Sequence, residues 1–222
     1  MRRIDAVFFD LDGTLTDPKV GITRCILHAL GELGVAPPHA DDLTWCIGPP
    51  LLESFKSMLG DDASAAVALK HYRARFSEVG LYENQLYDGV AEALQLLSGR
   101  GVSLFVATSK PQVYAQRIVD HFGLAACFED VFGPTLQGER ARKTDLLRWA
   151  LKKSAVKAGA AVMVGDRSHD IVGATDNGML AAGVLYGYGS REELEAAGAQ
   201  LLINSPDELG RILDARRIAR RC

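Results

Sequence analysis

Two aspartates, Asp10 and Asp12, follow the short apolar run that begins at Ile4. A run this short, rich in aliphatic and aromatic residues, is typical of a strand buried on both faces of a sheet. Side chains two positions apart on a strand point the same way, so both carboxylates would project together where the strand ends. Such carboxylates repel each other unless a cation neutralises them or one keeps its proton, and their oxygens suit Mg²⁺. Gly13 would let the backbone turn sharply beside a ligand, although Asp-Gly after a strand is also a common turn.

A second pair of carboxylates follows a later apolar run, Val162–Val164 and Gly165. Asp166 ends that predicted strand, and Asp170 lies four residues on, which is one helical turn later and on the same side. An Asp-x-x-x-Asp spacing alone is often a surface pair. Here it would place carboxylates at the same sheet edge as Asp10 and Asp12, where four of them require a metal and a lysine.

Three further residues are candidates for binding an anion. Thr108 and Ser109 follow the apolar run 102–107, and a hydroxyl with free backbone N–H groups beside a helix N-terminus suits a phosphate oxygen. The alternative is a helix cap. Lys143 precedes a predicted helix and would offset the aspartate charges and hold phosphate, or it would belong to a solvated basic turn with Arg140 and Arg142.

The elements needed to position these residues alternate along most of the chain. Strands are expected at 102–107, 131–133, 160–164 and 181–185, with helices between them and a last helix from Arg191. This alternation predicts an α/β fold with an open parallel sheet, in which ligands bind beyond the carboxyl ends of the strands. Between the first strand and residue 83 only helices are expected, roughly at 22–33, 51–59 and 63–78, so about seventy residues form an all-helical insertion.

Composition narrows the class of protein. The 222 residues are 48% hydrophobic and 24% charged, which is typical of a globular chain, and the net charge of −3 implies no general attraction to nucleic acid. Four scattered cysteines favour free thiols in a reducing compartment. The N-terminus does not resemble a secretory signal, and no apolar run is long enough to span a membrane. The expected location is the cytoplasm.

Taken together, the four motifs resemble those of the haloacid dehalogenase (HAD) superfamily of hydrolases. Asp10-x-Asp12-Gly13-Thr14 matches the first motif, Thr108 the second, Lys143 the third, and Gly165-Asp166-x-x-x-Asp170 the fourth. The resemblance covers essentially the whole chain and is closest to the phosphoglycolate phosphatase-like branch of subfamily IA. It implies a HAD-like Rossmannoid parallel sheet core, at residues 1–15 and 87–222, with an all-helical cap domain at residues 16–86, inserted after the first strand.

The resemblance also implies a mechanism and a cofactor. Asp10 would attack phosphorus to form an aspartyl-phosphate, and Asp12 would act as general acid and then general base. Mg²⁺ would be held by Asp10, the backbone carbonyl of Asp12, and Asp166. Thr108, Ser109 and Lys143 would bind the phosphate, with Asp170 and Gly13 in support.

The expected activity is therefore a Mg²⁺-dependent phosphatase acting on a small phosphomonoester, with phosphoglycolate as the first substrate candidate. A nucleoside 5′-monophosphate phosphatase is the second. A phosphomutase of the same fold and a non-catalytic binding protein on that fold stay open as alternatives. The expected partner is a small phosphorylated metabolite, with no nucleic acid and no membrane, and the chain would act as a monomer or homodimer.

Several other features have a possible function and a plain alternative. Gly48-Pro49-Pro50 could be a specificity loop of the cap or a turn between helices. Arg24 could contact substrate, although an exposed helix position is favoured, and His169 is expected to be a solvated residue within the fourth motif. The arginine-rich stretch 211–222 is expected to be a frayed, solvated terminal helix rather than a nucleic-acid or membrane contact.

Overall fold

The computed structural model describes residues 4–214 and contains a parallel sheet of the predicted kind. The order of the six strands is β5–β4–β1–β6–β7–β8, and all neighbouring pairs are parallel. The strand order reverses at β1, because the chain builds one side of the sheet after β1 and then crosses to the other. The carboxyl end of β1 is therefore where a ligand is expected. The strands are β1 (Ala6–Phe9), β4 (Ser103–Ala107), β5 (Asp130–Phe132), β6 (Ala161–Gly165), β7 (Leu180–Val184) and β8 (Leu201–Ile203).

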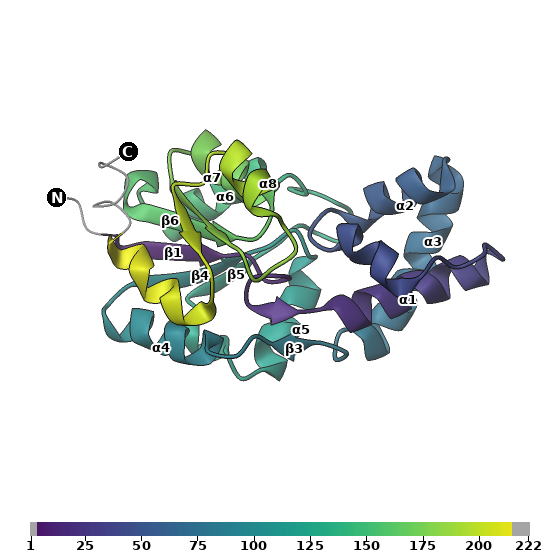
Figure 1. The fold of residues 1–222 in the computed structure, drawn as a ribbon, viewed down its shortest axis with the longest axis horizontal. Helices are drawn as coiled ribbons and strands as arrows, with labels where there is room; N and C mark the ends of the chain where they lie inside the picture. The colour runs from purple at the N-terminus through teal and green to yellow at the C-terminus, as the bar shows by residue number, and fades with distance from the viewer. Residues whose placement is uncertain (1–3, 215–222) are drawn as a thin grey trace.

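Helices cover both faces of this sheet (Figure 1). One face carries α6 (Lys143–Ser154), α7 (Ser168–Asp176) and α8 (Arg191–Ala196), and the other carries α4 (Val90–Gly99), α5 (Gln112–His121) and the 3-10 helix η5 (Pro206–Asp214). Successive β1 residues enter different layers: Phe8 packs in the cluster with Leu147 and Ile171, whereas Phe9 packs in the cluster with Leu94 and Ile118. This alternation follows from the two-residue period of a strand, and it explains why β1 is apolar throughout.

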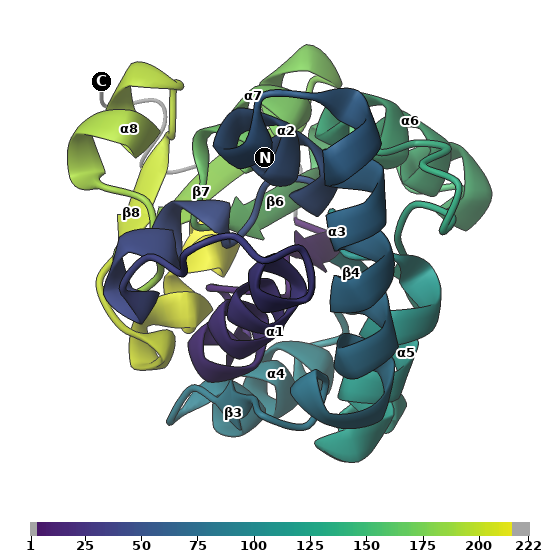
Figure 2. The same ribbon diagram turned by 90° about the vertical axis from the view of Figure 1, so that its right-hand side faces the viewer.

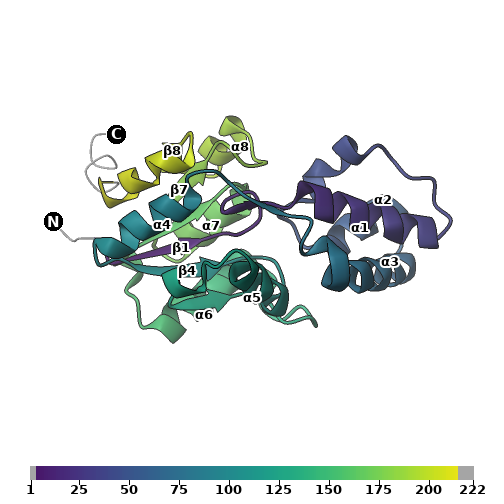
Figure 3. The same ribbon diagram turned by 90° about the horizontal axis from the view of Figure 1, so that it is seen from below.

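A group of helices, here called the helical lobe (residues 19–80), lies beyond the carboxyl edge of the sheet. Figures 1 and 3 show the lobe set apart from the sheet along the long axis of the molecule, and Figure 2 shows it in front of that edge. A short antiparallel ladder of β2 (Thr16–Asp17) and β3 (Gln85–Leu86) places the two connections to the lobe side by side. The lobe comprises α1 (Lys19–Glu32), the 3-10 helix η1 (Ala40–Cys46), α2 (Leu51–Leu59), α3 (Asp62–Arg75) and the π-helix η2 (Phe76–Gly80).

The structure differs from the sequence expectations in its shortest elements. β8 lies beyond the stretch 181–185 that was expected to be the last clear strand, and β2 lies in the region expected to contain only helices. These strands of two or three residues are too short to show a period of their own, and pairing with a neighbour defines them. The helix expected over 63–78 is α-helical only to Arg75 and then widens into η2. The division into core and cap at residues 16 and 86 stays a prediction.

Two other observations concern the described chain as a whole. No helix within residues 4–214 is both long enough and apolar enough to cross a membrane. Cys25, Cys46 and Cys127 are free thiols, as expected. The basic N-terminal residues 1–3 and most of the arginine-rich stretch, residues 215–222, lie outside the described part of the chain; Arg211, which lies within it, pairs with Glu208 at 2.8 Å.

The close approach of α1 to η2 provides a test of the lobe's packing. A Cβ on Gly21 would lie 2.1 Å from the carbonyl oxygen of Gly80, whereas nothing lies within 4 Å of a Cβ on Gly31 in the same helix. We expect Gly31→Ala to raise the free energy of unfolding by about 0.5–1 kcal/mol, as is usual in a helix. Gly21→Ala should instead lower it by about 1–3 kcal/mol, because the backbone must shift to admit the methyl group. Urea unfolding of both variants measures this, and equal effects would contradict the packing described.

Candidate active site

The predicted site residues converge at the carboxyl edge of the sheet, facing the helical lobe. Asp10 and Asp12 follow β1, Thr108 follows β4, and Asp166 follows β6. All four side chains are buried, with at most 7% exposure for Asp12. Parallel strands bring these residues together because all of their carboxyl ends meet at one edge.

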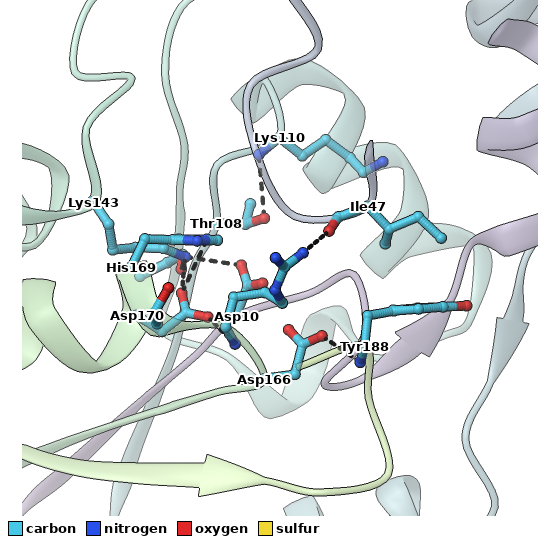
Figure 4. Close-up of polar contacts among 12 residues, drawn as sticks. Asp10, Ile47, Thr108, Lys110, Lys143, Asp166, His169, Asp170 and Tyr188 are labelled. Atoms are coloured by element: carbon cyan, nitrogen blue, oxygen red, sulfur yellow. Dashed lines mark hydrogen bonds and ion pairs between the residues drawn. The ribbon is translucent and has the colours of Figure 1, made fainter. Parts of the chain in front are cut away.

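The Lys143 ammonium connects two of the carboxylates (Figure 4). Its Nζ lies 2.9 Å from Asp10 Oδ1 and 2.7 Å from Asp170 Oδ1, and it donates a hydrogen bond to the Ala107 carbonyl at 2.8 Å. Burial disfavours the charged ammonium, but Asp10 and Asp170 outweigh this effect and raise the pKa of Lys143. Burial also opposes ionisation of Asp170, and here Lys143 prevails and lowers its pKa. For Asp10 burial prevails, so its pKa is raised despite Lys143.

Three carboxylates are arranged so that they could hold a divalent cation. One oxygen from each of Asp10, Asp166 and Asp170 lies within 4.8 Å of the other two. Asp166 Oδ2 accepts the backbone N–H of Tyr188 at 2.8 Å, while the buried Asp166 Oδ1 has no hydrogen-bond partner among residues 4–214. Burial, and then the charges of Asp170 and Asp10, raise the pKa of Asp166 well above its ordinary value. A buried oxygen cluster with an unpaired member fits a hard divalent cation.

Glycines allow the backbone to close around Asp166. Gly13 has a φ of +83°, and a Cβ there would lie 2.2 Å from Asp166 Oδ2. A Cβ on Gly187 would lie 2.4 Å from the Cβ of Asp166. The segment 186–190, interpreted from sequence as a plain turn after a strand, is a turn that also packs against this carboxylate. The glycines of this segment were the only sequence indication of close packing, and Asp166, the residue they pack against, is distant in the chain.

Asp12 faces a different cation from Asp10. Lys110 Nζ lies 2.7 Å from Asp12 Oδ2, and both side chains are buried. Lys110 was not among the residues expected at the site. Its position in Thr108-Ser109-Lys110-Pro111, directly after a strand, was the only signal, and a lysine in a turn is ordinarily solvated.

The hydrogen bonds of Thr108 differ in part from those expected. Its N–H is not free, because it donates to the Phe132 carbonyl at 2.9 Å. Its Oγ1 accepts the N–H of Lys110 at 3.2 Å (Figure 4). Helix α5 begins after Pro111, so Thr108 is not the residue that caps it. Thr108 is buried, whereas Ser109 lines the cavity described below.

A cavity of about 890 Å³ lies between the sheet edge and the helical lobe. The sheet side contributes Asp12, Ser109, Lys110 and Lys143 to its lining. The lobe side is mostly apolar and includes Ile22, Leu69, Tyr72, Phe76 and the loop 48–50, together with Arg73. The expected loop Gly48-Pro49-Pro50 therefore lines the cavity, whereas Arg24 does not and pairs with Glu83 at 2.7 Å.

The residue after Asp166 links the sheet to the lobe. The Arg167 guanidinium donates to the Ile47 carbonyl of the lobe at 2.8 Å and to Glu193 of α8 at 3.0 Å. His169 is partly exposed, with a side chain 30% accessible, and contributes to the cavity wall near Gly48. Arg167 was not selected from sequence, because its partners lie more than twenty residues away.

Comparisons with known proteins agree on one family. A family model described as haloacid dehalogenase-like hydrolase matches residues 7–184. A 5′-nucleotidase of Pseudomonas aeruginosa is 47% identical over 195 residues, which cover 87% of this chain and 88% of that protein. The tyrosine-protein kinase PtkA of Mycobacterium tuberculosis is 40% identical, over 91% of this chain and 70% of that protein. A phosphoglycolate phosphatase of Vibrio parahaemolyticus is 30% identical, over 93% of this chain and 94% of that protein. Among solved structures, a predicted phosphatase from Clostridium acetobutylicum has a TM-score of 0.92 at 40% identity, over 96% of this chain and 99% of that chain.

The raised pKa of Asp166 predicts how metal and stability are coupled. In the metal-free protein the unfolded chain ionises this carboxyl near its ordinary value of 3.8, before the folded state does, so Asp166 lowers stability as pH rises above that value. We expect Asp166→Asn to raise the free energy of unfolding of the metal-free protein at pH 7 by about 1–3 kcal/mol. The difference should vanish near pH 3. Added Mg²⁺ should stabilise the wild type and not the variant. Thermal unfolding with and without Mg²⁺ measures both effects, and a variant less stable than metal-free wild type at pH 7 would contradict the prediction.

Proposed function

The chain belongs to the haloacid dehalogenase-like hydrolases, in the phosphoglycolate phosphatase-like branch of subfamily IA, and we propose that it hydrolyses nucleoside 5′-monophosphates with Mg²⁺ through an aspartyl-phosphate. It is a phosphoric monoester hydrolase, and the family generally uses a divalent metal. The observation that carries the proposal is the Asp10 carboxylate, held by Lys143 at 2.9 Å and two residues from a second carboxylate that faces the cavity.

Each step of the proposed reaction is assigned to residues of the site. An oxygen of Asp10 forms a bond to phosphorus while the ester P–O bond breaks. Asp12 gives a proton to the leaving oxygen, and later takes one from the water that hydrolyses the aspartyl-phosphate. Asp12 suits this double role because it lines the cavity, where both the alcohol and water have access.

Charge has to be neutralised for one anion to attack another. Lys143 offsets the charge of Asp10, and Asp170 orients that lysine from 2.7 Å. Thr108 and Ser109 bind the phosphate oxygens. Asp10, Asp166 and the backbone carbonyl of Asp12 would hold Mg²⁺, which supplies positive charge that shields the nucleophile from the phosphate.

The size and lining of the cavity support a nucleotide over a two-carbon substrate. At about 890 Å³, the cavity is near the upper end of the roughly 300–1,000 Å³ range usual for drug-sized ligands. Phosphoglycolate would leave most of it empty, whereas a nucleoside would fill more of it and contact its apolar wall. The 47% identity to a 5′-nucleotidase supports the same choice. Phosphoglycolate is the second candidate, supported by the relative with that activity in its name. In this proposal the helical lobe is the cap that selects the leaving group.

Loss of the proposed nucleophile separates an enzyme from a binding protein on the same fold. We expect Asp10→Asn to lower kcat for p-nitrophenyl phosphate with Mg²⁺ by at least about 10³-fold, because no aspartyl-phosphate can form. Asp145→Asn, at a partly exposed position paired with Arg148, should retain activity. Released phosphate is the measurement. Wild-type protein that releases none would favour a binding protein. Transfer of phosphate to a sugar phosphate, with little release of free phosphate, would favour a mutase. Transfer to a tyrosine hydroxyl would favour a kinase, the activity in the name of the PtkA relative.

A substitution in the cavity wall tests the substrate class. Leu69 lies on α3 and lines the lobe side of the cavity. We expect Leu69→Trp to lower kcat/KM for adenosine 5′-monophosphate by about tenfold or more, because the indole takes space that the nucleoside needs. The same variant should leave kcat/KM for phosphoglycolate within about twofold, and Leu69→Met should affect neither substrate. A wild-type preference for phosphoglycolate, or an equal loss on both substrates, would contradict the assignment of nucleoside 5′-monophosphates as the substrates.

A further inference from the structure

Lys110 contacts both the sheet side and the lobe side of the site, and the reaction as assigned above does not use it. Its Nζ lies 2.7 Å from Asp12 Oδ2 and 4.5 Å from the centroid of the Phe76 ring of the lobe. Only 5% of its side chain is exposed. A lysine pays a desolvation cost in such a place, and the carboxylate and the aromatic face are the two partners that offset it.

The two oxygens of Asp12 are in different environments. Oδ2 is paired with Lys110, while Oδ1 is buried and has no hydrogen-bond partner in the described part of the chain. Asp12 lines the cavity, as do Lys110 and Phe76. One oxygen is therefore held by the Lys110 ammonium, and the other has no partner among the described residues.

Neighbouring residues hold both Lys110 and Phe76 in place. The Lys110 N–H donates to Thr108 Oγ1, and the Lys110 carbonyl packs so closely on Gly133 that a Cβ there would lie 2.6 Å from it. On the lobe side, Phe76 stacks with Tyr72 at a centroid distance of 5.3 Å and meets the edge of Tyr114 at 5.4 Å. The Lys110 ammonium thus lies between a hydrogen-bonded, closely packed turn of the core and an aromatic cluster centred on the lobe.

We propose that Lys110 is a positioning residue for Asp12, holding Oδ2 so that Oδ1 transfers the proton to the leaving oxygen, and that Phe76 completes this arrangement when the lobe covers the site. The proposal rests on the function proposed above. In the first step the Asp10–phosphorus bond forms, the ester P–O bond breaks, and the proton on Asp12 Oδ1 moves to the leaving oxygen. Lys110 keeps its own protons throughout. It is distinct from Lys143, which is bonded to Asp10 and Asp170 instead.

Leaving-group dependence tests this role. The parameter kcat/KM reports the steps up to formation of the aspartyl-phosphate, so it isolates the step in which Asp12 acts as an acid. Adenosine 5′-monophosphate and glycerol 2-phosphate have alkoxide leaving groups that need the proton, and the alkyl ester used is whichever of the two the wild type hydrolyses better. The p-nitrophenolate ion leaves without one.

We expect Lys110→Met to lower kcat/KM about 100-fold for the alkyl ester and less than about fivefold for p-nitrophenyl phosphate. Phe76→Leu should show the same selectivity with a smaller loss. Lys153→Met, at an exposed position of α6, should change neither value. Thermal unfolding checks that each variant is folded. If Lys110→Met does not fold, the test uses Phe76→Leu.

A second measurement asks whether Lys110 acts through Asp12. In an Asp12→Ala background, Lys110→Met should cause no further loss in single-turnover cleavage of the alkyl ester, because the residue it positions is gone. An equal loss on both esters, a rise in KM alone, or an additional loss in the Asp12→Ala background would overturn the proposal, since each indicates substrate binding or general structural support. Wild-type protein that releases phosphate from neither ester would instead overturn the proposed function, and this inference with it.

Discussion

Four buried carboxylates share one small region of this protein, and their repulsion is the constraint that the site has to satisfy. Asp10, Asp12, Asp166 and Asp170 have two ammonium partners there, since Lys143 pairs with Asp10 and Asp170 and Lys110 pairs with Asp12. Asp166 has no cationic side chain within ion-pair distance in the described structure, and burial raises its pKa well above the ordinary value. With all four carboxyls ionised, the two lysines would leave two negative charges in a region of low dielectric, and a divalent cation could balance them.

The sheet explains how such an unfavourable cluster can exist. β1 lies at the centre, with β4 and β6 paired to it in parallel register, so the residues that follow these strands are fixed by a buried apolar layer on each face. Burial of these apolar layers stabilises the fold enough to tolerate the repulsion between the carboxylates at the sheet edge. The glycines at 13 and 187 then allow backbone to approach Asp166 at distances that no side chain would permit.

The helical lobe adds the part of the site that parallel strands cannot provide. It closes one side of the cavity with an apolar wall, and it reaches the core through Arg167 at Ile47 and through Phe76 at Lys110. Both contacts involve residues next to, or bonded to, the proposed catalytic and metal-binding groups. The position of the lobe and the geometry of the site are therefore physically coupled, which fits a hydrolase that selects its leaving group by closure.

The α/β fold class could be predicted from the sequence, and so could the meeting of most candidate site residues at one sheet edge. The two-residue period of a strand is local, so Asp10 and Asp12 could be assigned to one edge without coordinates, and the parallel sheet inferred from alternating strands and helices brought Asp166 to the same edge. Asp170, four residues further on, followed from the helical period. The tertiary structure alone decided which cation meets which carboxylate, that Lys110 is buried against Asp12, that the turn at 186–190 packs on Asp166, and how large the cavity is. These features depend on contacts between residues far apart in the chain, and no local period or composition encodes such a contact. The short strands β2, β3 and β8 were missed for the same reason, because the partner strand defines them.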